Sequence, residues 1–229
     1  ELYTGKLLLQ NSEDVKRLVN TANKNQQTPL HVAALHGKNS LIKVLLDNSS
    51  CVSAVDNEKN TPLHLALAHS GNFDTVKLLL QQSEDVKSLV NAANENQETP
   101  LHLAVNKKSS EVVKLLVENL GNSSAPDRDK NTPLHLEIDG KCDFEVITLM
   151  LKHSEGIKCL VNAANKKQET PLQLAIKNEK HNIANRLGMI DNANKSCASL
   201  KDILGDPKGL HSLIFYDDFK AIDNFLQVK

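Results

Sequence analysis

The sequence predicts an all-α repeat solenoid, and three observations support this fold class. The phrase Thr-Pro-Leu-His occurs at 28–31, 61–64, 99–102 and 132–135, and a further copy at 170–173 ends in Gln. Successive copies are separated alternately by 33 and 38 residues. Apolar residues recur at helical spacing after each copy. Repetition at this period is typical of a stack in which each unit buries its apolar face only against its neighbours.

Each copy of the phrase is predicted to start a helix. Threonine can accept a hydrogen bond from an early helical N–H, and proline suits the first helical position because the N–H that it lacks would be unpaired there. Leu30, Ala33 and Ala34 follow at helical spacing and face inward. The next turn offers Gly37 or, in the second repeat, Gly71 for a left-handed C-terminal cap.

A second helix is predicted in each repeat, because apolar residues again recur at the helical period. We interpret this stripe as core. In the first four repeats it comprises Ile42, Leu45 and Leu46; Val76, Leu79 and Leu80; Val113, Leu116 and Val117; and Val146, Leu149 and Met150.

The unit that multiplied is a pair of repeats. Residues 7–31 and 78–102 align without gaps, 71 residues apart, and are identical at 20 of 25 positions. The longer spacing carries five extra residues at 83–87, where Ser83 is a plausible N-cap followed by two acidic residues. We expect a short helical turn on the outer edge, packed through Val86, Leu89 and Val90.

The two ends of the chain differ from the middle. Residues 1–22 are interpreted as the second helix and linker of a partial leading repeat, and residues 23–202 as five repeats. Residues 203–229 are interpreted as a sixth, degenerate repeat, because Leu210 and His211 keep the register of the earlier copies. This segment holds four of the seven aromatic residues, so it is either a terminal cap or an aromatic docking patch.

These residues resemble the ankyrin repeat, whose pattern contains Asp-x-x-Gly-x-Thr-Pro-Leu-His and, after the second helix, Val-Asn-Ala. The sequence supplies the first at 56–64, apart from its glycine, and the second at 90–92. The resemblance implies a β-hairpin finger and two antiparallel helices in each unit, stacked into a curved array. It also implies that the histidine of the phrase bonds threonine and backbone between adjacent units, which is a structural role.

Two departures from the family pattern affect the expected structure. The finger glycine is replaced by Gln26, Lys59, Gln97, Lys130 and Gln168. We expect Asn25 or Asn96 to take the left-handed position instead. In the fourth repeat Glu137 stands where the first has Ala33, so its carboxylate needs a partner or an exposed location.

The sequence offers no catalytic or metal-binding pattern, and we expect neither an enzyme nor a cofactor. Histidines of successive repeats should lie about 10 Å apart, too far to share one metal ion. The four scattered cysteines are interpreted as reduced. The net charge of −1, with only isolated basic doublets, argues against nucleic acid, and no apolar run is long enough to span a membrane.

The resemblance implies a binding face formed by the finger tips and the exposed side of the first helices. Carried over by position, its residues are Lys24, Asn25, Gln27, Leu35, His36, Asn57, Glu58, Asn60, His69, Glu95, Asn96, Glu98, Asn106, Lys107, Arg128, Asp129, Asn131, Asp139, Lys166, Lys167, Glu169, Lys177 and Asn178. The face is polar and of mixed charge, which suits a hydrated protein interface.

Three functional hypotheses remain open from the sequence. The first is a non-enzymatic scaffold that binds a partner protein. The second is the targeting region of a larger enzyme or toxin, since the chain opens inside a repeat. The third is self-association through the open ends of the stack. Lysine outnumbers arginine 24 to 3 and asparagine is abundant, so the chain also resembles ankyrin proteins of intracellular bacteria, for which we expect the host cytosol; otherwise we expect the cytoplasm.

Overall fold

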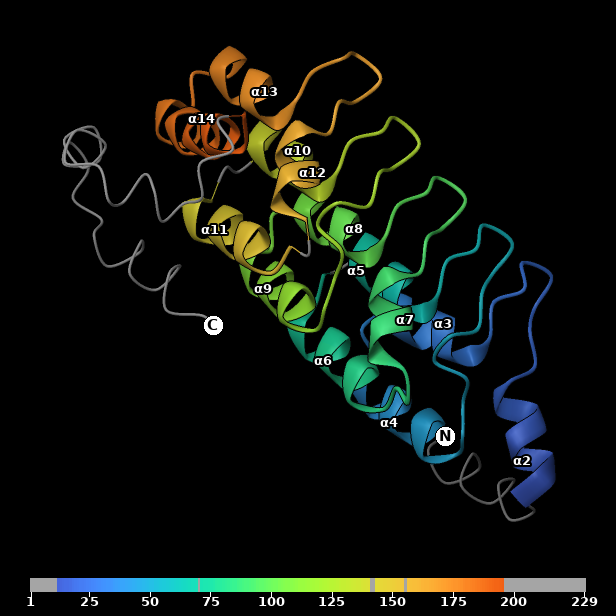
Figure 1. Cartoon of the computed structure of the whole chain (residues 1–229). Helices are drawn as coiled ribbons and strands as arrows, with labels where there is room; N and C mark the ends of the chain where they lie inside the picture. Colours follow the sequence, from blue (N-terminus) through green and yellow to red (C-terminus); the bar gives the residue numbers. More distant parts are fainter. Residues whose placement is uncertain (1–11, 70, 141–142, 155, 196–229) are drawn as a thin grey trace.

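The helices form an elongated stack with α2 (Ser12–Val19) and α14 (His181–Lys195) at opposite ends (Figure 1). The computed structural model describes residues 12–69, 71–140, 143–154 and 156–195. These residues form helices, turns and loops, and none of them lies in a β-strand. The all-α stack of repeats is therefore confirmed.

The first helices of the five repeats form one continuous layer. They are α3 (Pro29–Leu35), α5 (Pro62–His69), α8 (Pro100–Asn106), α10 (Pro133–Asp139) and α13 (Pro171–Lys177). Each of these helices packs against the next in the series. Their starts agree with the prediction, because Thr28, Thr99, Thr132 and Thr170 are extended N-caps followed by proline.

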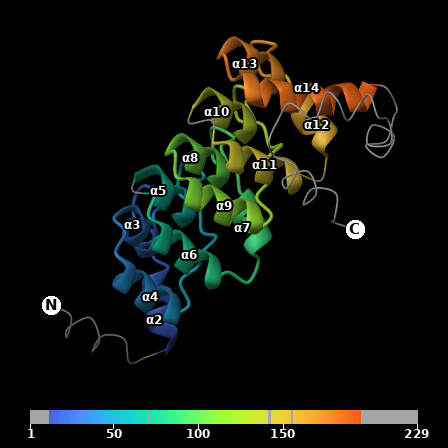
Figure 2. The ribbon, with the colours of Figure 1, turned by 90° about the vertical axis from the view of Figure 1, so that its left-hand side faces the viewer.

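The second helices form a second layer behind the first (Figure 2). They are α4 (Asn39–Asp47), α6 (Phe73–Gln81), α9 (Ser110–Glu118), α11 (Phe144–Lys152) and α14. In this layer α4 packs on α6, α6 on α9, and α9 on α11. The core lies between the layers, and several of its leucines, among them Leu63 and Leu79, are completely buried.

Left-handed residues close the turn between the two helices. Gly37 (φ 60°) and Gly71 (φ 57°) have this conformation, as predicted. Lys108 and Glu179, both at φ 57°, replace glycine in the third and fifth repeats. The turn therefore keeps its shape even where the residue type makes that conformation less favourable.

A third set of helices occurs in every second repeat. It consists of α2, α7 (Val86–Asn91) and α12 (Ile157–Asn162). The expected outer helical turn is thus present, with Leu89 and Val90 buried. The prediction of Ser83 as its N-cap was wrong. Asp85 immediately precedes the helix, and its carboxylate accepts hydrogen bonds from Ser88 N (2.9 Å) and Ser88 Oγ (2.5 Å).

Asparagines at the ends of α2 and α7 connect these helices to the following repeat. Asn20 Nδ2 donates to the Ser49 carbonyl (3.1 Å), and Asn20 Oδ1 accepts from Cys51 N (2.8 Å). Asn91, which lies 71 residues later, bonds Leu120 O (2.9 Å) and Asn122 N (2.7 Å) in the same way. Each asparagine therefore ties its own repeat to the loop after the next second helix.

Glu137 has the partner that its position required. The side chain is only 3% exposed, and Oε1 accepts a hydrogen bond from the backbone N–H of Asp143 at 2.8 Å. Asp143 is the N-cap of α11 and also accepts from Ser110 Oγ in the preceding repeat (2.8 Å). Glu137 thus secures the start of the second helix in the fourth repeat.

Replacing Glu137 by alanine is expected to lower the free energy of unfolding by about 1–3 kcal/mol, because Asp143 N–H loses a buried acceptor. Glutamine at 137 keeps an acceptor oxygen, so the Glu137→Gln variant should lose less than about 1 kcal/mol of unfolding free energy. Urea unfolding followed by circular dichroism measures both. A stability gain in the alanine variant would contradict this role, because it would mean that desolvation of the carboxylate outweighs the hydrogen bond.

Candidate partner-binding face

An Asn or Asp side chain organises each finger. Asp56 Oδ1 accepts hydrogen bonds from Glu58 N (3.0 Å) and Asn60 N (2.8 Å), and the Asp56 N–H donates to the Asn60 carbonyl (3.0 Å). The same pattern of side-chain bonds is made in the other four fingers by Asn23, Asn94, Asp127 and Asn165. A carboxylate or amide oxygen therefore fixes the turn from inside.

The left-handed residue of each finger is the one that replaces the family's glycine. Gln26, Lys59, Gln97, Lys130 and Gln168 all have φ between 58° and 61°. The expectation that Asn25 or Asn96 would take this conformation was wrong. The bonds to the organising Asn or Asp specify which residue turns, and glutamine or lysine accepts the left-handed conformation there. The fingers are hairpin-shaped turns, and among the described residues they contain no strand.

Backbone hydrogen bonds join neighbouring fingers into a row. Asn57 N donates to Asn25 O (3.0 Å), and Glu95 N donates to Glu58 O (2.8 Å). The remaining two junctions are made by Arg128 N with Asn96 O and by Lys166 N with Asp129 O, both at 2.9 Å. The row extends along the stack on the side from which the loops project (Figure 1). The five tips therefore form one connected edge.

Asn60 is the one predicted face residue that the structure buries, with 8% exposure. Its Oδ1 accepts from Asn94 Nδ2 of the next finger (3.2 Å), and its Nδ2 faces Asp56 Oδ2 (3.4 Å). Its side chain joins fingers and is not presented to a partner. Asn131, in the same place two repeats later, is half-buried and accepts from Asn165 Nδ2 (3.1 Å).

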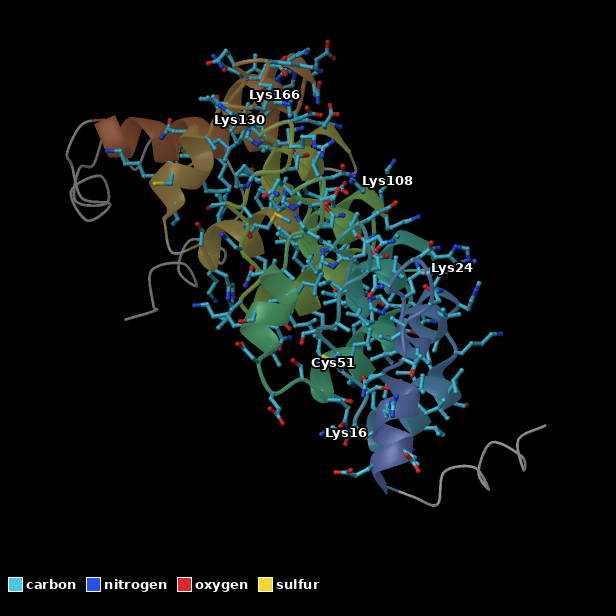
Figure 3. All side chains as sticks on the ribbon, turned by 90° about the vertical axis from the view of Figure 1, so that its right-hand side faces the viewer. Lys16, Lys24, Cys51, Lys108, Lys130 and Lys166 are labelled. Carbon is cyan, nitrogen blue, oxygen red and sulfur yellow. The ribbon has the colours of Figure 1, made fainter. Side chains whose placement is uncertain are left out.

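The other predicted face residues lie at the surface to different degrees. The half-buried ones are Gln27, Leu35, Glu98, Asn131, Glu169 and Asn178. The exposed ones are Lys24, Asn25, His36, Asn57, Glu58, His69, Glu95, Asn96, Asn106, Lys107, Arg128, Asp129, Asp139, Lys166, Lys167 and Lys177. The labelled lysines of Figure 3 show that cationic side chains are distributed along the stack, from Lys24 in the first repeat to Lys166 in the fifth.

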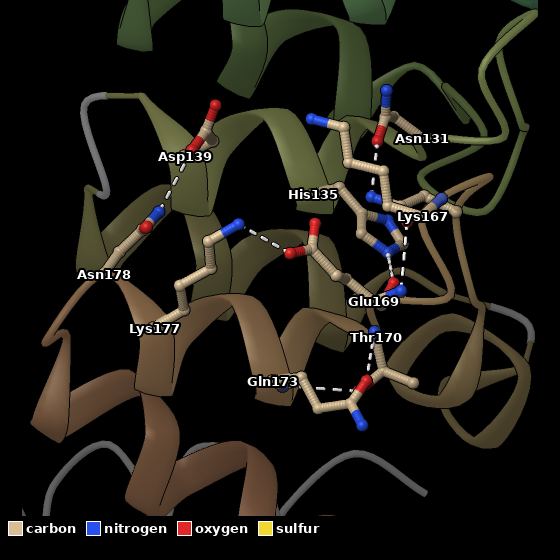
Figure 4. A network of polar contacts seen from close by, with 10 residues as sticks. Asn131, His135, Asp139, Lys167, Glu169, Thr170, Gln173, Lys177 and Asn178 are labelled. Atoms are coloured by element: carbon tan, nitrogen blue, oxygen red, sulfur yellow. Dashed lines mark hydrogen bonds and ion pairs between the residues drawn. The ribbon is translucent and has the colours of Figure 1, made fainter.

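Several charges of the finger row already interact with one another. Lys166 Nζ lies 3.1 Å from Asp129 Oδ1, and Lys59 Nζ lies 3.7 Å from Glu95 Oε1. In the fifth repeat Lys177 Nζ bonds Glu169 Oε1 (2.6 Å), which lowers the pKa of Glu169 and raises the pKa of Lys177 (Figure 4). These charges partly neutralise each other before any partner binds.

The ends of the first helices add a second row beside the fingers. His36 follows the last residue of α3, and His69 is the last residue of α5. Their rings meet edge to face with centroids 6.1 Å apart. Lys107 follows in the third repeat and lies beside Gly71, where an added Cβ would be 3.8 Å from Lys107 Cβ. Further along, Asn178 Nδ2 donates to Asp139 Oδ1 at 3.1 Å (Figure 4).

Buried histidines hold the finger row to the first helices. His64 Nδ1 accepts from Thr61 N (3.2 Å), so the proton of the neutral ring is on Nε2, which donates to Glu98 O in the next finger (3.2 Å). His31, His102 and His135 repeat this arrangement. Burial lowers the pKa of all four rings, that of His64 to about 4. These rings are neutral structural connectors.

In the fifth repeat glutamine replaces the histidine. Gln173 Oε1 accepts from Thr170 N at 2.9 Å, so the cap within the repeat is kept (Figure 4). Gln173 itself is exposed, whereas the four histidines are at most 1% exposed. The side-chain pattern of the repeat therefore changes at α13.

The described part of the chain contains no group of three or more His, Cys, Asp or Glu side chains placed to hold a metal ion. None of its helices combines the length and apolar character needed to cross a bilayer. Cys51 and Cys159 are exposed free thiols. The predicted degenerate repeat at 203–229 and the leading residues 1–11 lie outside the described residues.

Comparison with known proteins identifies the repeat. A family model described as ankyrin repeats in three copies matches residues 4–89 and 82–159. No curated protein matches the chain.

Proposed function

Because the chain belongs to the ankyrin-repeat family, whose repeats are generally protein–protein interaction scaffolds, we propose that it binds a partner protein through the finger row and the exposed ends of its first helices. The observation that supports this proposal most directly is the connected row of tips. Backbone bonds between Asn25, Glu58, Asn96, Asp129 and the fingers that follow them fix the spacing of the tips.

A fixed edge of this kind favours recognition, because ordering flexible loops would otherwise reduce the binding free energy. The tips and helix ends are polar, as in the rim of a hydrated interface. Their unlike charges are partly paired within the row, so the partner meets a patterned surface instead of a uniform charge. The proposal assigns recognition to this region and no catalytic step.

The ion pairs also decide which substitutions test the proposal. Changing Glu95, Asp129 or Lys166 would disturb contacts between fingers, so a loss of binding could reflect altered fingers. Lys24, Lys107 and Lys167 are exposed and, among the described residues, take part in no ion pair. They sample the first, third and fifth repeats and are the better probes.

The test compares two triple variants of equal charge change. The face variant carries Lys24→Glu, Lys107→Glu and Lys167→Glu. The control carries Lys43→Glu, Lys77→Glu and Lys152→Glu, at exposed positions of second helices. Nuclease-treated lysate is passed over each immobilised chain, and retained proteins are quantified by mass spectrometry.

We expect at least one retained protein to lose about tenfold or more in binding to the face variant, equivalent to about 1.4 kcal/mol, while the control retains it. The affinity of that protein is then measured by calorimetry. Equal loss in both variants, or no loss in either, would contradict the assignment of the face.

A further inference from the structure

The first helix of the fifth repeat exposes an apolar side chain that all earlier repeats bury. Ile176 on α13 is 60% exposed. Its counterparts in the first four repeats are Ala34, Leu67, Val105 and Ile138, none more than 4% exposed. The stack therefore contains four internal controls, which show that this position belongs inside a junction between repeats.

A second position on the same helix shows the same contrast. Leu172 is half-buried, whereas Leu30, Leu63, Leu101 and Leu134 are completely buried. In each earlier repeat the first helix of the following repeat packs against the first helix, as α13 does on α10. Within residues 12–195, α13 packs against α10, α12 and α14, and no later first helix covers it.

The asparagine that bridges alternate repeats is also incomplete at this end. Asn162 is the counterpart of Asn20 and Asn91, and it is exposed. Its Nδ2 donates to Lys158 O of its own helix (3.0 Å), like the bond of Asn91 to Lys87 O (2.8 Å). Among the described residues no loop of a following repeat meets Asn162. Apolar burial and polar bridging thus both stop at the fifth repeat.

We propose that residues 208–226 of the same chain cover the Leu172–Ile176 face as a sixth repeat. Lys208 lies 38 residues after Thr170, and Leu210 and Leu213 then fall at the positions of Leu172 and Ala175. Further on, Ile222, Phe225 and Leu226 keep the register of Ile42, Leu45 and Leu46. The segment has the apolar spacing that the exposed face requires.

A covalent link favours this occupant over a second copy of the chain. In the sequence only residues 196–207 separate α14 from the segment. Its binding to α13 would therefore be intramolecular, with an effective concentration on the order of millimolar. A second copy would have to reach such a concentration to compete. The inference is independent of the partner-binding proposal, because it concerns the end of the stack and not the finger row.

Hydrogen exchange of the α13 amides in the full chain tests the proposal. Ile176→Asp and Leu213→Asp are each expected to raise these exchange rates by about tenfold or more, because either change removes the cover of α13. If the two side chains share one junction, the double variant should exceed the larger single effect only slightly. Val55 is an exposed apolar residue far from α13 in the sequence, with 51% exposure. Val55→Asp serves as the control and should leave the exchange rates of the α13 amides unchanged.

Leu213→Asp could alter residues 208–226 without any contact to α13, so a second measurement follows this segment when α13 is changed. The chain has no Trp and two Tyr, so in a Tyr3→Phe background the fluorescence comes from Tyr216. Ile176→Asp should increase acrylamide quenching of Tyr216, because a change on α13 then releases the segment. Unchanged quenching together with unchanged α13 exchange in Leu213→Asp would overturn the proposal. Protection of α13 that rises with protein concentration, with a doubled mass in light scattering, would overturn it in favour of a second copy.

Discussion

Replacement of His64 by alanine is expected to lower the free energy of unfolding by about 3 kcal/mol. The ring is fully buried, bonds Thr61 through Nδ1 and donates from Nε2 to Glu98 O in the next finger. Alanine removes both hydrogen bonds and leaves a cavity, and these losses add. Denaturant unfolding followed by circular dichroism provides the measurement.

Glutamine at 64 is the matched control, because Gln173 shows what it does in this fold. Gln173 Oε1 accepts from Thr170 N (2.9 Å) and so keeps the helix cap. His64→Gln should therefore lose the hydrogen bond to Glu98 but retain the one to Thr61. We expect its decrease in unfolding free energy to be about half of that in His64→Ala. Losses below about 1 kcal/mol in both variants would show that His64 is not a connector between repeats.

Acidification from pH 7 to pH 5 is expected to destabilise the stack through the same histidines. Burial lowers the pKa of His64 to about 4, below its ordinary value of 6.5. The neutral, buried ring contributes its full stabilisation above pH 6.5. This contribution is lost as the pH falls from 6.5 toward 4, because in this range the unfolded chain binds a proton at His64 and the folded chain does not. For His64 alone this amounts to about 2 kcal/mol at pH 5.

The measurement compares the unfolding free energy of the wild type and of His64→Gln at both pH values. His31, His102 and His135 also have lowered pKa values, so the wild-type loss should exceed that of one ring. His64→Gln should lose about 2 kcal/mol less than the wild type on acidification. Equal losses in the two proteins would contradict a neutral, buried His64.

The helices and their core could be predicted from the sequence, because each repeat gives the same signal independently. Thr-Pro marks the start of a first helix, and leucines such as Leu30 and Leu79 follow at spacings that fit only one face of a helix. The period of 71 residues also identified the pair as the unit, and α2, α7 and α12 recur at that period.

The fingers could not be predicted to the same degree, because their shape depends on side chains reaching backbone across the turn. Asp56 and its counterparts decide which residue is left-handed, and the residue type at the tip does not reveal this. The position of Asn60 in the finger predicts that it belongs to the binding face. Its amide instead bonds the next finger, a contact between residues 34 apart that spacing alone does not specify.

The bridging asparagines also determine how the number of repeats can change. Asn20 and Asn91 make their junctions at alternate steps, so the stack contains two kinds of junction. Gain or loss of a whole 71-residue pair recreates only junctions that already exist, whereas gain or loss of one repeat would bring unlike faces together. Recombination between misaligned copies should therefore lengthen or shorten this protein two repeats at a time. The identity of 20 in 25 residues between two such pairs is the trace that one event of this kind leaves.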